Sequence, residues 1–309
     1  VPSLYGLPTS GYLLENDGKG TFTDVTEEKA KGLKNIGMIT DAVWTDFDND
    51  KDLDLIIVGE WMQIKLFINE NERLKEKVID GLSKSNGFWN TIEAADLDND
   101  GDDDYIVGNL GYNTFFKATD NQPVEMHVND FDQNGKIEQI ITTYKEGQPY
   151  PLALKGDITK QMPHLLKKYL KHEAYQRQTM KDIFNYNEMK DMLSFQVYET
   201  GSCVFWNEGN RLVKQKLPFE AQLAPVYAIH ITDVNHDGNK DIILGGNQYN
   251  AKPQTGIYAG SYGAVLSNTG DKSFQYIKPS DSGFKISGQI RDIKSIYIKD
   301  KEYILIAKN

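Results

Sequence analysis

Short apolar stretches alternate with acidic loops along the chain, in a pattern that occurs four times. In each copy, residues of alternating hydrophobicity precede an acidic loop of nine residues, and a run of aliphatic residues follows the loop. The four copies cover residues 41–61, 93–111, 127–144 and 230–248. Alternation indicates a strand with one buried face, and a short aliphatic run indicates a strand that is buried on both faces. Each copy therefore predicts two strands joined by an acidic loop.

A second repeated unit is a hairpin with a turn rich in Asn and Gly. Three such hairpins follow the strand pairs, at residues 64–79, 202–217 and 263–277. A fourth hairpin, at residues 11–25, opens the chain without a strand pair before it, whereas residues 288–308 supply two strands with no hairpin after them. The two ends of the chain are therefore complementary halves of one four-stranded module.

This complementarity predicts an all-β fold, a β-propeller of four-stranded blades that forms one domain over residues 1–309. We expect the N-terminal strands (11–25) to pair with the C-terminal strands (288–308), because this closure removes the open sheet edges of a linear array. The four acidic loops and the shared module predict five blades, and six or seven blades are the alternatives.

Residues 157–193 break the strand pattern. Leu165, Leu166, Tyr169 and Leu170 recur at helical spacing there, and β-branched residues are few. We expect two or three helices, inserted between the second and third strands of blade three. Two interpretations are open: a packing cap, or a lid over one face of the ring with four exposed lysines (Lys160, Lys167, Lys168 and Lys171).

The composition of the chain limits the classes of partner and site that it can have. The net charge of −11 argues against nucleic acid, because binding to phosphates needs a basic stripe. With Cys203 as the single cysteine, an intramolecular disulfide and a zinc site of several cysteines are both excluded. No apolar run reaches the length of about 18 residues that a membrane span needs, so we expect no membrane insertion. Much of the negative charge lies in the acidic loops, where a bound cation would neutralise it.

The acidic loops carry oxygen donors at regular positions. Positions 1, 3, 5 and 9 of each loop offer side-chain oxygens, position 7 can offer its backbone carbonyl, and position 6 favours glycine for a tight turn. Asp103, at position 8 of the second loop, is a spare carboxylate that we expect to face solvent. The candidate metal ligands are Asp46, Asp48, Asp50, Asp52 and Asp54; Asp96, Asp98, Asp100, Asp102 and Asp104; Asp130, Asp132, Asn134, Lys136 and Glu138; and Asp233, Asn235, Asp237, Asn239 and Asp241.

So many hard oxygen donors predict Ca²⁺, up to four ions, rather than Mg²⁺, which prefers fewer protein ligands and more water. Transition metals would require His or Cys ligands. An EF-hand begins with a similar loop but needs flanking helices and a glutamate at position 12. Here position 12 is aliphatic and the flanks are strands, so the EF-hand is excluded. A solvated acidic turn is the plain alternative for one loop, but four equivalent copies disfavour it.

A ligand-binding face is a separate prediction. Polar residues follow the aliphatic runs at similar offsets, aromatic residues lie near them, and such groups at a propeller rim could bind a sugar or peptide. The alternative is that they satisfy turn backbones between blades. The candidate ligand-binding residues are Glu60, Trp61, Trp89, Asn109, Tyr112 and Asn247. No motif for catalysis appears, so no catalytic residue is assigned.

The sequences "DFDNDKDLDLIIVG", "DLDNDGDDDYIVGN" and "DVNHDGNKDIILGGN" resemble FG-GAP/VCBS-type repeats, the calcium-loop propeller modules of integrin α-subunits and many bacterial surface or secreted proteins. The resemblance implies calcium in each fitted loop and an extracytoplasmic location, either secreted or at the cell surface. Lys51 in place of glycine and the pair Asn134 and Glu138 depart from the repeat pattern.

Two functions follow as hypotheses. The first is a calcium-binding extracellular propeller that serves as a binding or scaffold module for protein or glycan ligands. The second is a carbohydrate-active enzyme, similar to a polysaccharide lyase, on the same scaffold. A cleft that holds an unallocated carboxylate, tyrosine or lysine pair beside a bound metal would favour the enzyme.

Overall fold

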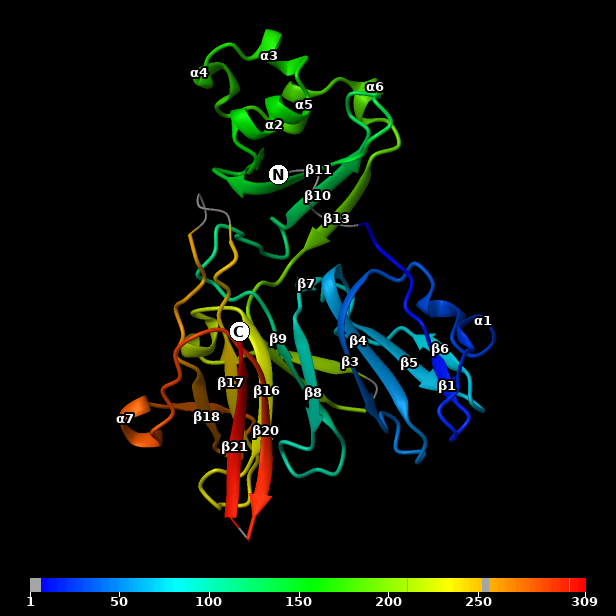
Figure 1. Ribbon diagram of the computed structural model, residues 1–309, viewed down its shortest axis with the longest axis vertical. Coiled ribbons are helices and arrows are strands. Elements are labelled where there is room, and N and C mark those ends of the chain that lie inside the picture. Colours follow the sequence, from blue (N-terminus) through cyan, green and yellow to red (C-terminus); the bar gives the residue numbers. More distant parts are fainter. Residues whose placement is uncertain (1–6, 210, 252–255, 300) are drawn as a thin grey trace. The chain divides into compact units, whose positions relative to one another are not determined.

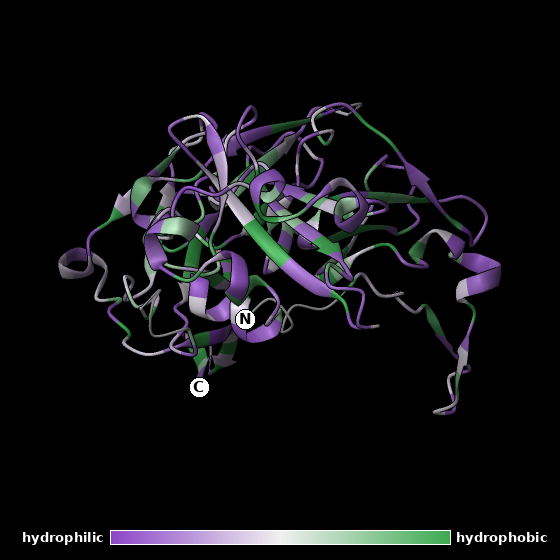
Figure 2. Cartoon of the chain, turned by 90° about the horizontal axis from the view of Figure 1, so that it is seen from above, coloured by the Kyte–Doolittle hydropathy of each residue, from purple (hydrophilic) through white to green (hydrophobic). Residues whose placement is uncertain are grey.

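Strands predominate in the computed structural model, which describes residues 7–209, 211–251, 256–299 and 301–309 (Figure 1). The fold is mostly β, built from antiparallel sheets in the manner of a propeller. Apolar residues concentrate on the strands, whereas the connecting loops are mainly hydrophilic (Figure 2). The all-β prediction is therefore confirmed.

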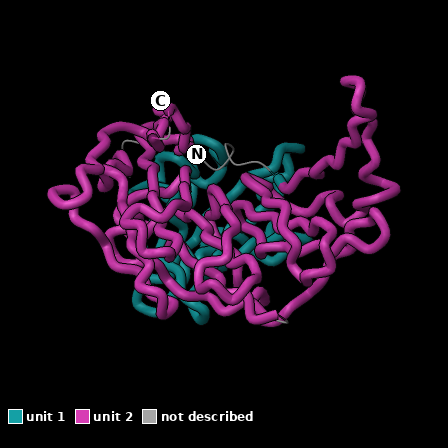
Figure 3. Tube along the Cα trace, turned by 90° about the horizontal axis from the view of Figure 1, so that it is seen from below, with its two compact units in different colours: residues 1–7, 116–199 teal, residues 8–115, 200–309 magenta. Residues whose placement is uncertain are grey.

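The chain divides into two compact units (Figure 3). The main unit comprises Pro8–Phe115 and Thr200–Asn309, and the inserted unit comprises Val1–Leu7 and Phe116–Glu199. The chain enters the inserted unit after the second acidic loop and returns before the strand that contains Cys203.

The first blade of the main unit is formed by consecutive segments. Its strands are β3 (Met38–Thr45), β4 (Asp54–Met62), β5 (Lys65–Asn69) and β6 (Leu74–Lys77), in spatial order β3-β4-β5-β6, and β7 (Gly87–Phe88) pairs with the end of β4. Strand β4 is buried along almost its whole length, as its aliphatic run predicts.

The second blade is assembled from two distant segments. Strands β8 (Thr91–Ala95) and β9 (Asp104–Gly108) pair with each other, and β9 then pairs with β14 (Cys203–Asn207), which pairs with β15 (Leu212–Lys216). The insertion therefore interrupts this blade. The expectation that it interrupts blade three was wrong, because β14 pairs with β9 and not with β11.

The third blade again uses consecutive strands, β16 (Val226–Thr232), β17 (Asp241–Gly246), β18 (Ala264–Asn268) and β19 (Phe274–Ile277). The short helices of the main unit lie between strands: α1 (Thr26–Lys29), η2 (Lys31–Leu33), η3 (Phe219–Gln222) and α7 (Pro279–Ser282).

The two ends of the main unit form separate hairpins. Strand β1 (Leu14–Asn16) pairs with β2 (Phe22–Asp24), and β20 (Ile290–Ile298) pairs with β21 (Lys301–Lys308). Among the described residues these are two independent two-stranded sheets, so the predicted pairing of residues 11–25 with 288–308 is not observed. The described part of the main unit contains three four-stranded blades instead of the five predicted.

Neighbouring blades pack through their first strands and their apolar faces. Strand β8 packs beside β3 and β16, and β16 also packs beside β20. Val58 and Leu66 of the first blade share a core with Trp89 and Phe205 of the second, whose rings meet edge to face at 6.0 Å. Each large apolar side chain buried in this way stabilises the fold by about 1.5–3 kcal/mol.

The inserted unit has its own sheet, of β10 (Val124–Asn129), β11 (Glu138–Lys145), β12 (Gln148–Pro151) and β13 (Leu193–Val197), in order β12-β11-β10-β13. The third copy of the acidic pattern therefore belongs to this sheet and not to a blade of the main unit. This outcome could not be read from the pattern, since β12 and β13 carry no acidic loop.

Helices between β12 and β13 confirm the predicted helical segment. They are α2 (Lys155–Gln161), α3 (Leu165–Lys168), α4 (His172–Tyr175), α5 (Met180–Ile183) and α6 (Tyr186–Met189). Leu165 and Tyr169 are buried with Phe131 and Ile140 in one core, and Phe131 stacks on Phe184 at 4.4 Å. The helices thus cap this sheet, and the side chains of Lys160, Lys167, Lys168 and Lys171 are exposed.

Candidate metal centres

The four acidic loops share one backbone conformation. Position 4 of each loop is left-handed, at Asn49, Asn99, Gln133 and His236, with φ between 56° and 60°. Position 6 is also left-handed, at Gly101, Gly135 and Gly238, where glycine avoids the strain of a side chain. Lys51 adopts the same conformation, with φ of 78°. The first loop therefore keeps the turn without its glycine.

Hydrogen bonds turn the side chains into the loop. The position 6 N–H donates to the position 1 carboxylate in all four loops, at 3.1 Å for Asp46, 3.2 Å for Asp96, 2.8 Å for Asp130 and 2.9 Å for Asp233. The position 7 N–H donates to the position 5 side chain in each loop, at 2.8–3.2 Å. These backbone N–H donors thus fix the orientation of the side chains at positions 1 and 5.

The position 9 carboxylate ties the loop to the blade. The carboxylate of Asp54 accepts the N–H of Phe47 at 3.0 Å and the N–H of Asn69 at 2.8 Å, so it joins the loop to the end of the third strand. Asp104 and Asp241 make the same two bonds in the other blades. All three aspartates are completely buried.

This structural role of position 9 was missed in the sequence analysis. A signal for it exists, because an asparagine begins the hairpin turn that the carboxylate contacts in each blade, at Asn69, Asn207 and Asn268. In the inserted unit, Glu138 accepts the N–H of Phe131 at 3.0 Å, and its other oxygen lies 3.5 Å from the amide of Gln161.

Three of the loops bring acidic oxygens within 4.8 Å of one another: Asp46, Asp48 and Asp50; Asp96, Asp98 and Asp104; and Asp130, Asp132 and Glu138. The fourth loop replaces two of its acids with amides, and Asn235 donates to Asp237 at 2.8 Å. With three acidic residues and one lysine each, the third and fourth loops carry less negative charge than the first two.

Several loop oxygens are buried without a donor. Within the described part of the chain, one carboxylate oxygen of each of these residues has no hydrogen-bond partner: Asp46, Asp52, Asp96, Asp102 and Asp132. An unpaired buried polar oxygen is unfavourable by about 1–3 kcal/mol, and more when it is charged. A hard cation would satisfy these oxygens, so the donor set fits Ca²⁺.

The electrostatics of the second loop support this fit. Burial, followed by the charge of Asp100, raises the pKa of Asp102 to about 6. Burial also raises the pKa of Asp104 to about 7. Crowded carboxylates of this kind favour either protons or a cation.

Two other carboxylates of the second loop have partners. Burial opposes the ionisation of Asp98, but the Lys272 ammonium, 2.7 Å away, lowers its pKa overall. Asp103 accepts the hydroxyl hydrogen of Thr45 at 2.8 Å and is half-buried. The expectation that Asp103 faces solvent was wrong, because position 8 of this loop contacts the first blade.

The predicted ligand-binding residues are mostly internal. Trp61, Trp89, Asn109 and Asn247 are buried, and only Glu60 and Tyr112 are half-exposed. Trp89 donates to the carbonyl of Ser85 at 2.7 Å, and Asn247 donates to the carbonyls of Ser261 and Gly288 at 2.7 and 2.8 Å. These side chains satisfy turn backbones, so the structure does not present them as an exposed binding face.

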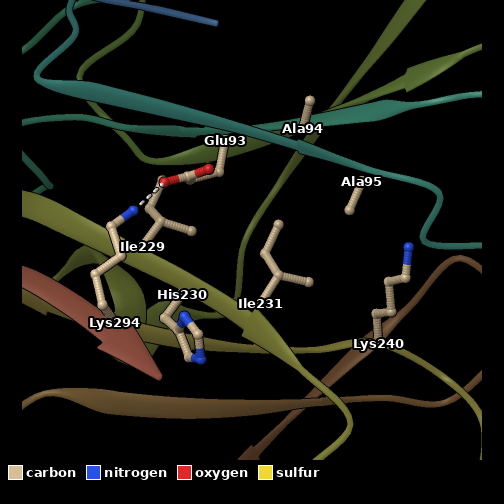
Figure 4. A pocket seen from close by; sticks show the side chains of 8 residues that line it. All are labelled: Glu93, Ala94, Ala95, Ile229, His230, Ile231, Lys240 and Lys294. Carbon is tan, nitrogen blue, oxygen red and sulfur yellow. Dashed lines mark hydrogen bonds and ion pairs between the residues drawn. The ribbon is translucent and has the colours of Figure 1, made fainter. Parts of the chain in front are cut away.

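An open cavity of about 250 Å³ lies between β8, β16 and β20. In Figure 4, Lys294 reaches toward Glu93 at 3.4 Å, whereas Lys240 lies apart from both. The Nε2 atom of His230 is buried without a partner in the described residues, and burial lowers its pKa. The sequence analysis missed this group because three separate strands contribute to it. Its full lining is Glu93, Ala94, Ala95, Ile229, His230, Ile231, Lys240 and Lys294.

Comparison with known families agrees with the loop geometry. Residues 46–107 match the model of the FG-GAP-like repeat. This match extends from the first acidic loop to the strand after the second. No curated protein shows a significant match to the sequence. None of the helices in the described part of the chain has the length and apolarity that a bilayer crossing requires.

Proposed function

We propose that this chain, which carries an FG-GAP-like repeat over residues 46–107, is a calcium-binding propeller module that binds protein or glycan ligands outside the cytoplasm. The observation that carries the proposal is the set of buried carboxylate oxygens in the loops that have no donor among the described residues. The repeat supports the proposed binding-module architecture, and the unsatisfied oxygens support the proposed calcium sites.

The oxygen-only donor sets favour Ca²⁺ over other cations. Ca²⁺ takes six to eight oxygen ligands in flexible geometry, whereas Mg²⁺ demands a near-ideal octahedron and keeps several waters. When bound, the ion supplies positive charge that neutralises the crowded aspartates. The side chains at positions 1, 3 and 5, with the position 7 backbone, would hold it. The position 9 carboxylate, which already accepts two backbone N–H groups in each blade, would keep the loop in place.

An extracytoplasmic location is consistent with this chemistry. Extracellular modules bind calcium with dissociation constants of about 10⁻⁴–10⁻³ M. Sites of such affinity stay unoccupied at cytosolic calcium concentrations. Cys203 is the single cysteine and is buried, and one cysteine cannot form an intramolecular disulfide. Bound ions would therefore take the stabilising role that disulfides have in many secreted domains.

Calcium titration with chelation tests the proposal. We expect isothermal titration calorimetry to detect calcium binding, and excess EDTA to lower the melting temperature by several degrees. Ligands that bind only the folded state stabilise it by about 2.7 kcal/mol at a hundredfold excess over the dissociation constant. Magnesium at the same concentration serves as the control. A melting curve that EDTA leaves unchanged, with no heat of binding, would refute the calcium proposal.

A glycan and protein array tests the ligand part. We expect binding that requires calcium, because the loops connect the strands that build the blades. Binding that is equally strong in EDTA would separate ligand recognition from the metal centres.

The cavity between β8, β16 and β20 favours a second candidate, a polysaccharide lyase. It contains two lysines and a histidine with an unpartnered nitrogen, and Lys240 directly precedes Asp241 of the fourth loop. Such groups could remove the C5 proton of a uronate and return a proton to the glycosidic oxygen as its bond to C4 breaks, while a cation neutralises the carboxylate. The test is the formation of unsaturated uronates from acidic polysaccharides, followed by ultraviolet absorbance, with His230→Gln as the inactive control.

A further inference from the structure

The second acidic loop is covered by a hairpin turn of the third blade. Asn268, at the end of β18, donates to the carbonyl of Leu97 at 2.6 Å. Four residues later, the ammonium group of Lys272 lies 2.7 Å from the carboxylate of Asp98 at loop position 3. The turn therefore contacts both the backbone and a candidate calcium ligand of the neighbouring blade.

Lys272 is held over the loop by its surroundings. Its carbonyl accepts the amide of Gln215 at 3.0 Å, and its ammonium lies 5.4 Å from the centre of the Trp206 ring. Trp206 in turn stacks on Phe274 at 6.0 Å. The Asp98 side chain is only 7% exposed, whereas the Lys272 side chain is 40% exposed, so the carboxylate end of the ion pair is shielded from water and the ammonium end is partly open to it.

The turn itself does not require a lysine at this place. The hairpin turn between β1 and β2 reads "NDGKGTF" (16–22), and the turn between β18 and β19 reads "NTGDKSF" (268–274), so Gly20 stands where the other turn has Lys272. In the described residues, Asp48 and Asp132, the position 3 acids of the first and third loops, form no ion pair with a lysine. The contact is thus particular to the second loop.

We propose that Lys272 limits the cation affinity of the second loop, so that calcium and this lysine compete for Asp98. The inference rests on the proposed calcium function. An ammonium group within a few ångströms of the cation site repels the cation. This repulsion is stronger than in bulk water, because the Asp98 carboxylate between them is largely removed from solvent. Filling the loop therefore weakens the contact that docks the β18–β19 turn, and calcium occupancy is coupled to the junction between the second and third blades.

Calorimetry on three variants of the full chain tests this competition. Asp98→Asn identifies the binding step that belongs to the second loop. Lys272→Met should tighten that step about three- to tenfold, because one unfavourable charge interaction is removed. Lys19→Met, in the equivalent turn of β1–β2, is the matched control and should leave all steps unchanged. Circular dichroism confirms that each variant is folded.

Hydrogen exchange of the β18–β19 turn gives a second measurement. Calcium should increase amide exchange over residues 269–273 in the wild type, and Lys272→Met should show the faster exchange with or without calcium. Unchanged or weaker calcium binding in Lys272→Met, in a wild type that does bind calcium, would overturn the competition alone. A wild type without any calcium binding would overturn the proposed function itself, and the competition with it.

Discussion

At the residue scale, each position 9 carboxylate of the blades already accepts two backbone N–H groups and so holds the blade together in the absence of a cation. Asp241 is completely buried, and its two oxygens accept the N–H groups of Val234 and Asn268 at 3.0 and 2.7 Å. An asparagine at this place would turn an NH₂ group toward one of the N–H donors. The buried donor would then be unsatisfied, at a cost of about 1–3 kcal/mol.

We therefore expect Asp241→Asn to lower the free energy of unfolding by about 2 kcal/mol in urea denaturation with EDTA present. Asp237→Asn is the control, since it removes the same charge from an exposed side chain of the same loop. Equal losses in the two variants would mean that charge, and not the two backbone hydrogen bonds, determines the effect.

A second residue-scale prediction concerns His127 on β10. Its ring nitrogens lie 3.1 Å from the Ser194 hydroxyl and 3.3 Å from the Thr142 hydroxyl. Burial lowers the pKa of His127, although the nearby Glu125 carboxylate acts in the opposite direction. A histidine whose folded pKa lies below its unfolded value near 6.5 binds protons more readily when unfolded. Stability should therefore fall as the pH decreases from about 6.5 toward the folded pKa.

Amide exchange of β10 and β13 measured between pH 7.5 and 5.5 checks this direction, because it reports on the inserted unit. His127→Gln should reduce the pH dependence, whereas His164→Gln, at an exposed histidine, should keep it. A wild type whose β10 protection increases on acidification would contradict the sign.

At the element scale, the local sequence pattern predicts the repeated strands and loops, but it does not predict which strands pair with each other. The acidic loops, the hairpins and the helical segment are local patterns, and each was found where it was expected. Strand β14 was assigned to the blade of β11, the nearer strand along the chain, whereas it pairs with β9. The cavity was missed because its residues come from strands that are distant in sequence.

The pairing of β9 with β14 predicts that the inserted unit can be removed. The strands align Tyr105 with Phe205 and Val107 with Cys203, and the N–H of Gly111 donates to the carbonyl of Thr200 at 2.7 Å. We expect a short Gly-Ser linker in place of residues 116–199 to leave a cooperative thermal transition. Deletion of residues 200–217, which removes β14 and β15, should abolish the transition. A main unit that unfolds after the first excision would show that its blades depend on the insert.

At the scale of the whole molecule, the net charge of −11 is concentrated where cations are proposed to bind. Without metal, repulsion among the loop aspartates opposes folding, and dissolved salt screens it over a distance of about 10 Å at 0.1 M. We expect NaCl to raise the melting temperature of the EDTA-treated protein. With saturating calcium, the same NaCl addition should have little effect. Equal salt responses with and without calcium would contradict local neutralisation, and differential scanning calorimetry measures both.

The split second blade also has a consequence for biosynthesis. As the chain leaves the ribosome, β8 and β9 emerge long before β14, and the whole inserted unit is complete in the interval. Domains tend to fold as they emerge, so the insert can fold while the edge of β9 is still unpaired. Strands β14 and β15 can then join β8 and β9 only after the inserted unit has been synthesised. Completion of the second blade is therefore a step with long-range contacts in the folding of the chain.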